Sequence, residues 1–163
     1  YKRQMHDSAG TSYHYMVADA SGRSAIFEWV AADDDTDTDG SARELRVTYN
    51  DDDAAFGEAE AAADYQWVTN FVLEPNYYAS DDAKKGLDRY NELYTRLSAT
   101  DGIVADESAA MDVLAAVGRR SWNNDDANTI TVHSVVYNLT DRVMYWVPNE
   151  NFDDASAWIT YKL

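Results

Sequence analysis

The sequence predicts an α+β fold in which two helices stand between two groups of strands. Three segments rich in β-branched and aromatic residues precede residue 50, two segments with helical spacing lie between residues 83 and 117, and three further strand-like segments follow residue 128. Strands grouped on either side of helices, and not alternating with them one by one, are typical of antiparallel sheets in this class. Because the chain is long enough for one ordinary core, we expect a single unit over residues 1–163.

The first strands are predicted from residue types and a turn signal. Tyr13–Asp19 and Ala25–Ala31 are rich in β-branched and aromatic residues. Ser21-Gly22 lies between them and favours a turn, so the two segments predict a β-hairpin. Glu44–Tyr49 alternates apolar and polar residues at the strand period, which predicts a third strand.

The next part of the chain gives a weaker signal followed by a stronger one. Residues 51–64 are dominated by Ala, Asp and Glu without a clear apolar stripe, and either a short surface helix or a loop fits them. Gln66–Leu73 is predicted as a strand. It is expected to end at Glu74-Pro75, because proline lacks a donor and restricts the residue before it. This strand would carry Asn70.

Two helices are predicted in the middle of the chain. The first covers about residues 83–98, where apolar residues recur at helical spacing, namely Leu87, Tyr90, Leu93, Tyr94 and Leu97. Asp81-Asp82 precede it, where the helix macrodipole favours anions. The second covers residues 106–117, with Asp106 as the N-cap and Gly118 as the stop signal.

Three strands are predicted to close the chain. Thr129–Tyr137, Val143–Val147 and Ala157–Leu163 are rich in β-branched and aromatic residues. Asn138–Arg142 has the composition of a turn between the first two of these segments.

The composition narrows the class of partner. Thirteen Lys and Arg residues against thirty Asp and Glu residues give a net charge of −17, which repels nucleic-acid phosphates and anionic lipid surfaces. Five Trp, twelve Tyr and four Phe residues indicate a folded body and not a disordered acidic tail. The sequence has no run of eighteen apolar residues. We therefore expect neither a nucleic-acid nor a membrane partner. The sequence leaves the location of the protein unknown, with a cytoplasmic one favoured.

Asn70 and Arg89 offer an amide and a guanidinium, but no nucleophile accompanies them. The chain contains no Cys and begins with Tyr1, so no thiol and no N-terminal Ser, Thr or Cys is present to attack an amide. The lack of Cys also excludes thiolate metal sites, and the sequence predicts neither a metal nor a cofactor.

Four motifs in a fixed order carry a resemblance to a known family. They are a hairpin at His14–Trp29, a Thr-Asn strand end at Val68–Phe71, an Arg-aromatic helix start at Leu87–Tyr90 and a Ser-Val-Val-Tyr strand at His133–Thr140. Together they make residues 13–148 similar to the choloylglycine hydrolase family of linear amide C–N hydrolases, which includes bile salt hydrolases and penicillin V acylases. The related acyl-CoA:6-aminopenicillanic acid acyltransferases share much of this layout.

The resemblance implies a role for each candidate residue. It implies that the chain is the C-terminal half of an N-terminal nucleophile (Ntn) hydrolase domain, an αββα sandwich, without the N-terminal segment that carries the nucleophilic Cys. Asn70 matches the asparagine of the oxyanion hole, and Arg89 matches the arginine beside the nucleophilic sulfur. The implied partners are that N-terminal segment and a small amide substrate: a conjugated bile salt, penicillin V or an N-acyl amino acid. A homo-oligomer is also expected, and the family is chiefly bacterial.

Plainer interpretations of the same residues stay open. Thr69-Asn70 also fits a turn or a cap. Arg89 also fits a surface ion-pair partner of Asp88 or Asp82, and such a pair would contribute about 0–1 kcal/mol. The whole chain also fits a structural or binding module without a nucleophile, or the acyltransferase type.

Three further motifs are given structural interpretations. His14 and His133 lie in strand-like segments without metal ligands at suitable spacing, so core or interface histidines are favoured. Asp35–Gly40 begins like an EF-hand loop, but Arg46 stands where the closing Glu is required, and a solvated hairpin loop is favoured. Asn138–Thr140 fits a glycosylation acceptor but falls in the predicted turn.

Overall fold

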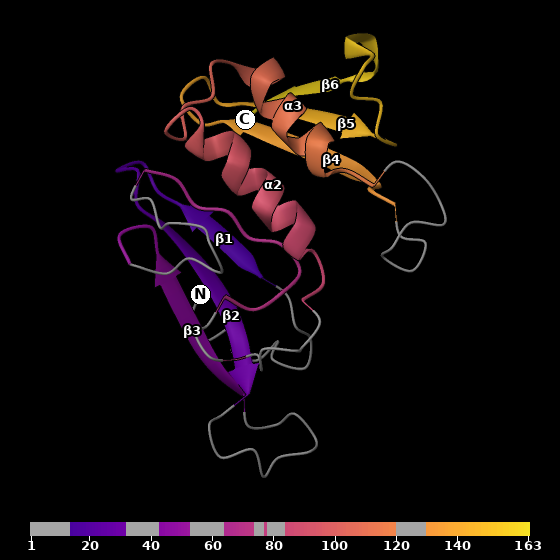
Figure 1. Ribbon diagram of the computed structural model, residues 1–163. Helices are drawn as coiled ribbons and strands as arrows, with labels where there is room; N and C mark the ends of the chain where they lie inside the picture. The colour runs from indigo at the N-terminus through magenta and orange to yellow at the C-terminus, as the bar shows by residue number, and fades with distance from the viewer. Residues whose placement is uncertain (1–13, 32–42, 53–63, 74–76, 78–83, 120–129) are drawn as a thin grey trace. The chain divides into compact units, whose positions relative to one another are not determined.

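The computed structural model describes residues 14–31, 43–52, 64–73, 77, 84–119 and 130–163 (Figure 1). The chain falls into two compact units, Tyr1–Tyr90 and Asn91–Leu163. The described residues form two antiparallel three-stranded sheets and two α-helices, which confirms the predicted α+β class. Compact units of one chain can still unfold together, so the single unit expected over residues 1–163 stays a prediction.

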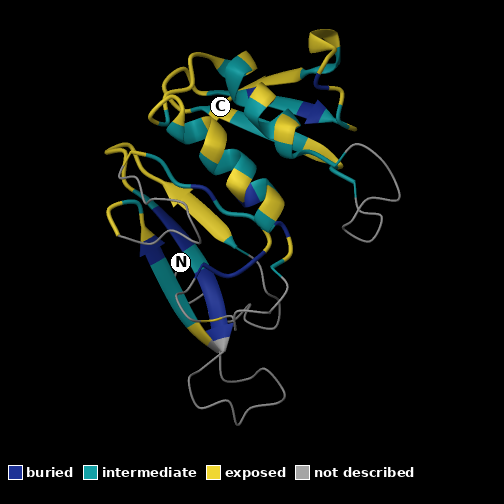
Figure 2. Ribbon diagram, viewed as in Figure 1, coloured by how far each residue is buried: buried dark blue, intermediate teal, exposed yellow. Residues whose placement is uncertain are grey.

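The first unit contains the sheet β1-β2-β3. β1 (Tyr15–Ala18) pairs with β2 (Ser24–Ala31), and β2 pairs with β3 (Arg43–Tyr49), both antiparallel. The predicted hairpin and third strand are therefore confirmed. Gly22 takes a φ of +87° in the hairpin turn. β2 is the central strand, and Figure 2 shows it buried along much of its length.

Residues 66–73 do not form the predicted strand. This segment pairs with neither sheet and bends at residues 70 and 71. Side chains replace the missing strand partners, because Gln66 Nε2 donates to Thr48 O at 3.2 Å and the Glu28 carboxylate accepts from Leu73 N. The backbone is thus anchored to the sheet at separate points and not by a continuous ladder.

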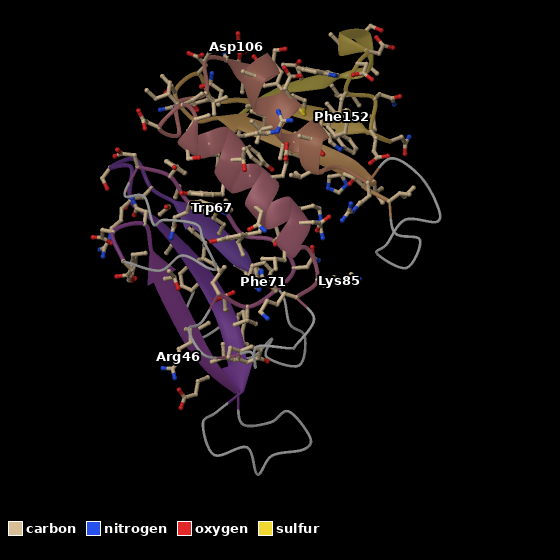
Figure 3. The ribbon with its side chains drawn as sticks, in the orientation of Figure 1. Arg46, Trp67, Phe71, Lys85, Asp106 and Phe152 are labelled. Carbon is tan, nitrogen blue, oxygen red and sulfur yellow. The ribbon has the colours of Figure 1, made fainter. Side chains whose placement is uncertain are left out.

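The apolar residues that suggested a strand pack around a helix residue. Trp67 and Phe71, which are labelled in Figure 3, are buried. Each ring centroid lies 5.2 Å from that of Tyr90, which is 1% exposed. The burial pattern therefore arises from aromatic packing in an irregular segment.

The first helix, α2 (Leu87–Ser98), begins later than the predicted residue 83. Residues 84–86 form a turn, and Gly86 has a φ of +86°, outside the helical region. Its carbonyl accepts the first helical hydrogen bond, from Tyr90 N at 2.9 Å. α2 starts in the first unit and continues into the second.

The second unit contains α3 (Glu107–Val117) and the sheet β4-β5-β6. The Asp106 carboxylate accepts from Ala109 N at 2.8 Å, which confirms the predicted N-cap, and Gly118 ends the helix as predicted. The strands are β4 (His133–Asn138), β5 (Val143–Pro148) and β6 (Ile159–Lys162). A short 3₁₀ helix, η1 (Ala155–Ala157), precedes β6. The three C-terminal strands are confirmed, and the first begins later than predicted.

The core of the second unit lies between α3 and the sheet. Its buried residues are Met111, Val147 and Phe152. The partly buried residues packed against them are Leu114, Ala115, Val136, Tyr145 and Trp158. Met111 comes from α3, and Val147 comes from β5.

Some predictions fall outside the described residues. These are the acidic loop Asp35–Gly40, most of the ambiguous segment 51–64, the strand end at Glu74-Pro75, and Asp81-Asp82 before α2.

Candidate functional site

The structure brings Asn70 and Arg89 together. They are 19 residues apart in the sequence, and Arg89 Nη2 donates to Asn70 Oδ1 at 2.6 Å. A guanidinium has only donors, so the amide atom that faces it is the carbonyl oxygen. The Nδ2 hydrogens of Asn70 are therefore directed away from Arg89.

Gly86 makes room for this contact. A β-carbon at position 86 would lie 2.8 Å from Arg89 Nη2 and 3.3 Å from Asn70 N, and the φ of +86° also favours glycine. Thr69 Oγ1 donates to Gly86 O at 3.0 Å, which ties the turn before α2 to the segment that carries Asn70. The sequence alone did not indicate a role for Gly86, although Gly86 directly precedes the Leu87–Tyr90 motif.

His14 and Glu28 hold the same segment from the sheet. His14 Nδ1 donates to Thr69 O at 2.7 Å, and His14 Nε2 lies 3.2 Å from Glu28 Oε1. Burial lowers the pKa of His14, and the hydrogen bond to Thr69 O partly opposes this shift. Both Glu28 oxygens also accept from Leu73 N, at 2.9 and 3.1 Å. Asn70 thus lies between two backbone positions that these side chains hold.

The sequence favoured a core or interface histidine at position 14 but did not indicate its carboxylate partner. One signal was available, because the hairpin pairs Tyr15 with Phe27 and extending that register by one position places residue 14 opposite residue 28. His133, by contrast, is exposed on β4, with its ring edge-on to Trp146 at 6.1 Å.

The second unit has a pocket of about 410 Å³ that includes neither Asn70 nor Arg89. Its walls are residues 104–107 and 110, around the start of α3, and residues 136–138 and 141 of the β4–β5 hairpin. The charged residues in these walls are all acidic, so the pocket presents no basic side chain to an anion.

Glu107 links α3 to the second sheet beside this pocket. Its Oε1 accepts from Asn138 Nδ2 at 2.8 Å and from Tyr145 OH at 3.3 Å. The Asn138 hydrogen bond lowers the pKa of Glu107, while burial and then the Glu107 charge raise the pKa of Tyr145. Asn138 also bonds Asp141 through both ends of its amide, so the side chain of the apparent glycosylation motif is already engaged.

Two further properties of the described residues concern metal binding and membrane spans. Among them, no three His, Asp or Glu side chains gather closely enough to hold a metal ion. The helices in the same part of the chain are too short or too polar to cross a membrane.

No protein-family model, curated protein or solved structure matches this chain.

Proposed function

We propose that this chain supplies the oxyanion donor and a cationic residue of an Ntn-type hydrolase that cleaves linear amide C–N bonds. In this proposal the nucleophile is the N-terminal Cys of a segment upstream in the same protein, and the αββα sandwich forms with that segment. The substrates are conjugated bile salts, penicillin V or N-acyl amino acids, as the sequence motifs imply.

Asn70 and Arg89 have different roles in the proposed amide hydrolysis. The Cys thiolate attacks the amide carbonyl, the C–N bond breaks as the amine leaves with a proton, and water then hydrolyses the thioester. Asn70 Nδ2 donates to the negative carbonyl oxygen of each tetrahedral intermediate. Arg89 stays positively charged and favours the thiolate over the thiol.

The observation that carries the proposal is the 2.6 Å hydrogen bond from Arg89 Nη2 to Asn70 Oδ1. It fixes the amide with its donor end turned away from the cation, and Asn70 is exposed, so a ligand can reach that end. A donor held in advance by its neighbours costs no reorganisation during the reaction, and loss of one such donor lowers turnover by about 10²–10³-fold.

An Asn70→Asp substitution tests the donor role directly. The carboxylate still accepts from Arg89, but it has no hydrogen to give to an oxyanion. In the longer protein that includes the upstream Cys, we expect Asn70→Asp and Asn70→Ala to lower kcat by about 10²-fold with little change in KM.

Asn91→Asp is the matched control, because Asn91 is exposed on the same helix as Arg89 and the change adds the same charge. This control should keep full turnover. If Asn70→Asp also keeps full turnover, Asn70 is only a structural partner of Arg89. The chain of 163 residues alone should not hydrolyse these amides above background, since it has no Cys.

A further inference from the structure

The segment that carries Asn70 is held at two backbone positions by one pair of side chains. His14 bonds Thr69 O, one residue before Asn70, and Glu28 bonds Leu73 N, three residues after it. The two side chains also meet each other at 3.2 Å. This segment pairs with no strand of either sheet. The side-chain contacts therefore replace the backbone hydrogen bonds that a neighbouring strand would provide over residues 69–73.

Glu28 is an unusual residue at its position. Its neighbours on the same face of β2 are Ile26 and Val30, and all three are at most 2% exposed. An isolated carboxylate at such a place costs several kcal/mol, so it must be matched by hydrogen bonds. An apolar residue here would fill the space but would leave Leu73 N without its acceptor.

The hydrogen-bond geometry also determines how many protons the contact between His14 and Glu28 contains. Thr69 O accepts only, so His14 Nδ1 must carry a hydrogen. His14 Nε2 then meets Glu28 Oε1 favourably only if one proton lies between them, on the ring or on the carboxyl group. Burial disfavours the charged ring, which lowers the pKa of His14. Whether the proton resides on the His14 ring or on the Glu28 carboxyl group, the contact between the two side chains contains one proton.

We propose that His14 and Glu28 are a proton-sharing pair of positioning residues that fix the Thr69–Leu73 segment and thereby aim the Asn70 amide at the oxyanion. This inference rests on the proposed function for its last step. The positioning of the segment itself is a property of this chain and is measured without a substrate.

The first experiment uses the chain alone and follows the Leu73 amide and the Asn70 side-chain amide by NMR. Glu28→Ala removes the acceptor of Leu73 N, so its hydrogen exchange should accelerate by about tenfold or more and the Asn70 signals should shift. Glu28→Gln should preserve both, because its oxygen accepts from Leu73 N while its NH₂ group donates to His14 Nε2. Asp51→Ala, which removes an exposed carboxylate after β3, is the control and should change neither.

Two outcomes overturn the positioning role: unchanged Leu73 exchange in Glu28→Ala, or the same damage in Glu28→Gln as in Glu28→Ala. If Glu28→Ala does not fold, the nitrogen shifts of the His14 ring in the unmodified chain provide the test. The pair requires Nδ1 to be protonated around neutral pH, and a ring protonated at Nε2 alone contradicts it.

The second experiment separates this inference from the proposed function. In the longer protein with its upstream Cys, Glu28→Ala should lower kcat more than it raises KM, and Glu28→Gln should restore kcat. If the NMR results hold but Asn70→Asp keeps full turnover, the proposed function fails and the positioning of the segment stands. If Asn70→Asp loses turnover but Leu73 is indifferent to Glu28, the positioning role fails and the proposed function stands.

Discussion

Gly86 lies so close to Arg89 that a β-carbon at position 86 would stand 2.8 Å from the Nη2 atom of the guanidinium. Arg89 Nη2 thereby lies in the space that a β-carbon at position 86 would need, and the same atom donates to Asn70 Oδ1 at 2.6 Å. The contact between the Asn70 amide and the Arg89 guanidinium therefore depends on glycine, which has no side chain, at position 86.

Gly86→Ala should therefore cost more stability than Gly22→Ala. Both glycines have nearly the same backbone, with φ values of +86° and +87°, but a β-carbon at Gly22 meets nothing within 4 Å. The left-handed backbone should cost about 1–2 kcal/mol in each variant. In Gly86→Ala alone, the end of the flexible Arg89 side chain must also move and lose its hydrogen bond to Asn70, which should add about 0.5–1.5 kcal/mol. Urea unfolding followed by Trp fluorescence measures the difference, and equal losses would show that Arg89 moves aside freely.

The second prediction concerns pH and Glu107. The hydrogen bond from Asn138 lowers the pKa of Glu107 below its ordinary value of 4.5. The folded protein thus binds this proton less readily than the unfolded chain does, so the stabilisation is complete above about pH 4.5. It is lost as the pH falls through the folded-state pKa.

Glu107→Gln removes this titration, so the difference in unfolding free energy between the unmodified protein and this variant should shrink on acidification. The difference isolates Glu107 from Asp19 and Asp154, whose pKa values are also lowered, chiefly by hydrogen bonds from Ser21 and Ser156. A difference that stays constant from about pH 7 to about pH 3 would contradict the role of the Asn138 contact.

Regular elements were predictable where the residue types within one segment determine the local structure. The hairpin followed from its two β-rich segments around Ser21-Gly22, and the start of α3 followed from the N-cap Asp106. Gln66–Leu73 was predicted wrongly, because burial of Trp67 and Phe71 around Tyr90 gives the same apolar pattern as a strand.

The site was only partly predictable for a related reason. Asn70 and Arg89 were named from their motifs, and the structure places them in contact. The need for glycine at position 86 depends on a positive φ and a close approach, which no residue pattern reveals. Glu28 has the residue type of a surface strand position, and only the fold shows that it is buried under Leu73.

The third prediction tests whether the two compact units unfold as one. Met111→Ala removes a side chain that is 1% exposed in the core of the second unit and should cost about 2–5 kcal/mol. If the chain is a single cooperative unit, hydrogen exchange should accelerate to the same extent for core amides of β2 and of β5. Ile103→Ala, at a position 73% exposed, is the control and should have little effect. Acceleration confined to β5 would mean that the units unfold separately.

The fourth prediction concerns association. β1 is an edge of the first sheet as described, and Tyr15, Met16 and Val17 on it are 36–48% exposed. Exposed apolar edge strands favour pairing with another chain, so we expect the isolated chain to form dimers or larger species. Val17→Lys should weaken this association, whereas Arg142→Lys, in the exposed β4–β5 turn, should not. Sedimentation at several protein concentrations distinguishes these cases, and a monomer at every concentration would refute the prediction.

The last prediction rests on the proposed function and tests the charge of Arg89 in a longer protein that carries the proposed upstream Cys. A fixed positive charge beside a thiol favours the thiolate, so Arg89→Ala should raise the pKa of the thiol and move the pH profile of its alkylation rate upward by about one unit or more. Arg89→Lys keeps a charge but offers a different donor geometry, so it should move the profile less while still lowering turnover. Arg96→Ala is the matched control, because Arg96 lies on the same helix in an exposed ion pair with Glu92 at 2.6 Å. If Arg89→Ala leaves the profile where Arg96→Ala leaves it, Arg89 does not act on the nucleophile and its role is structural.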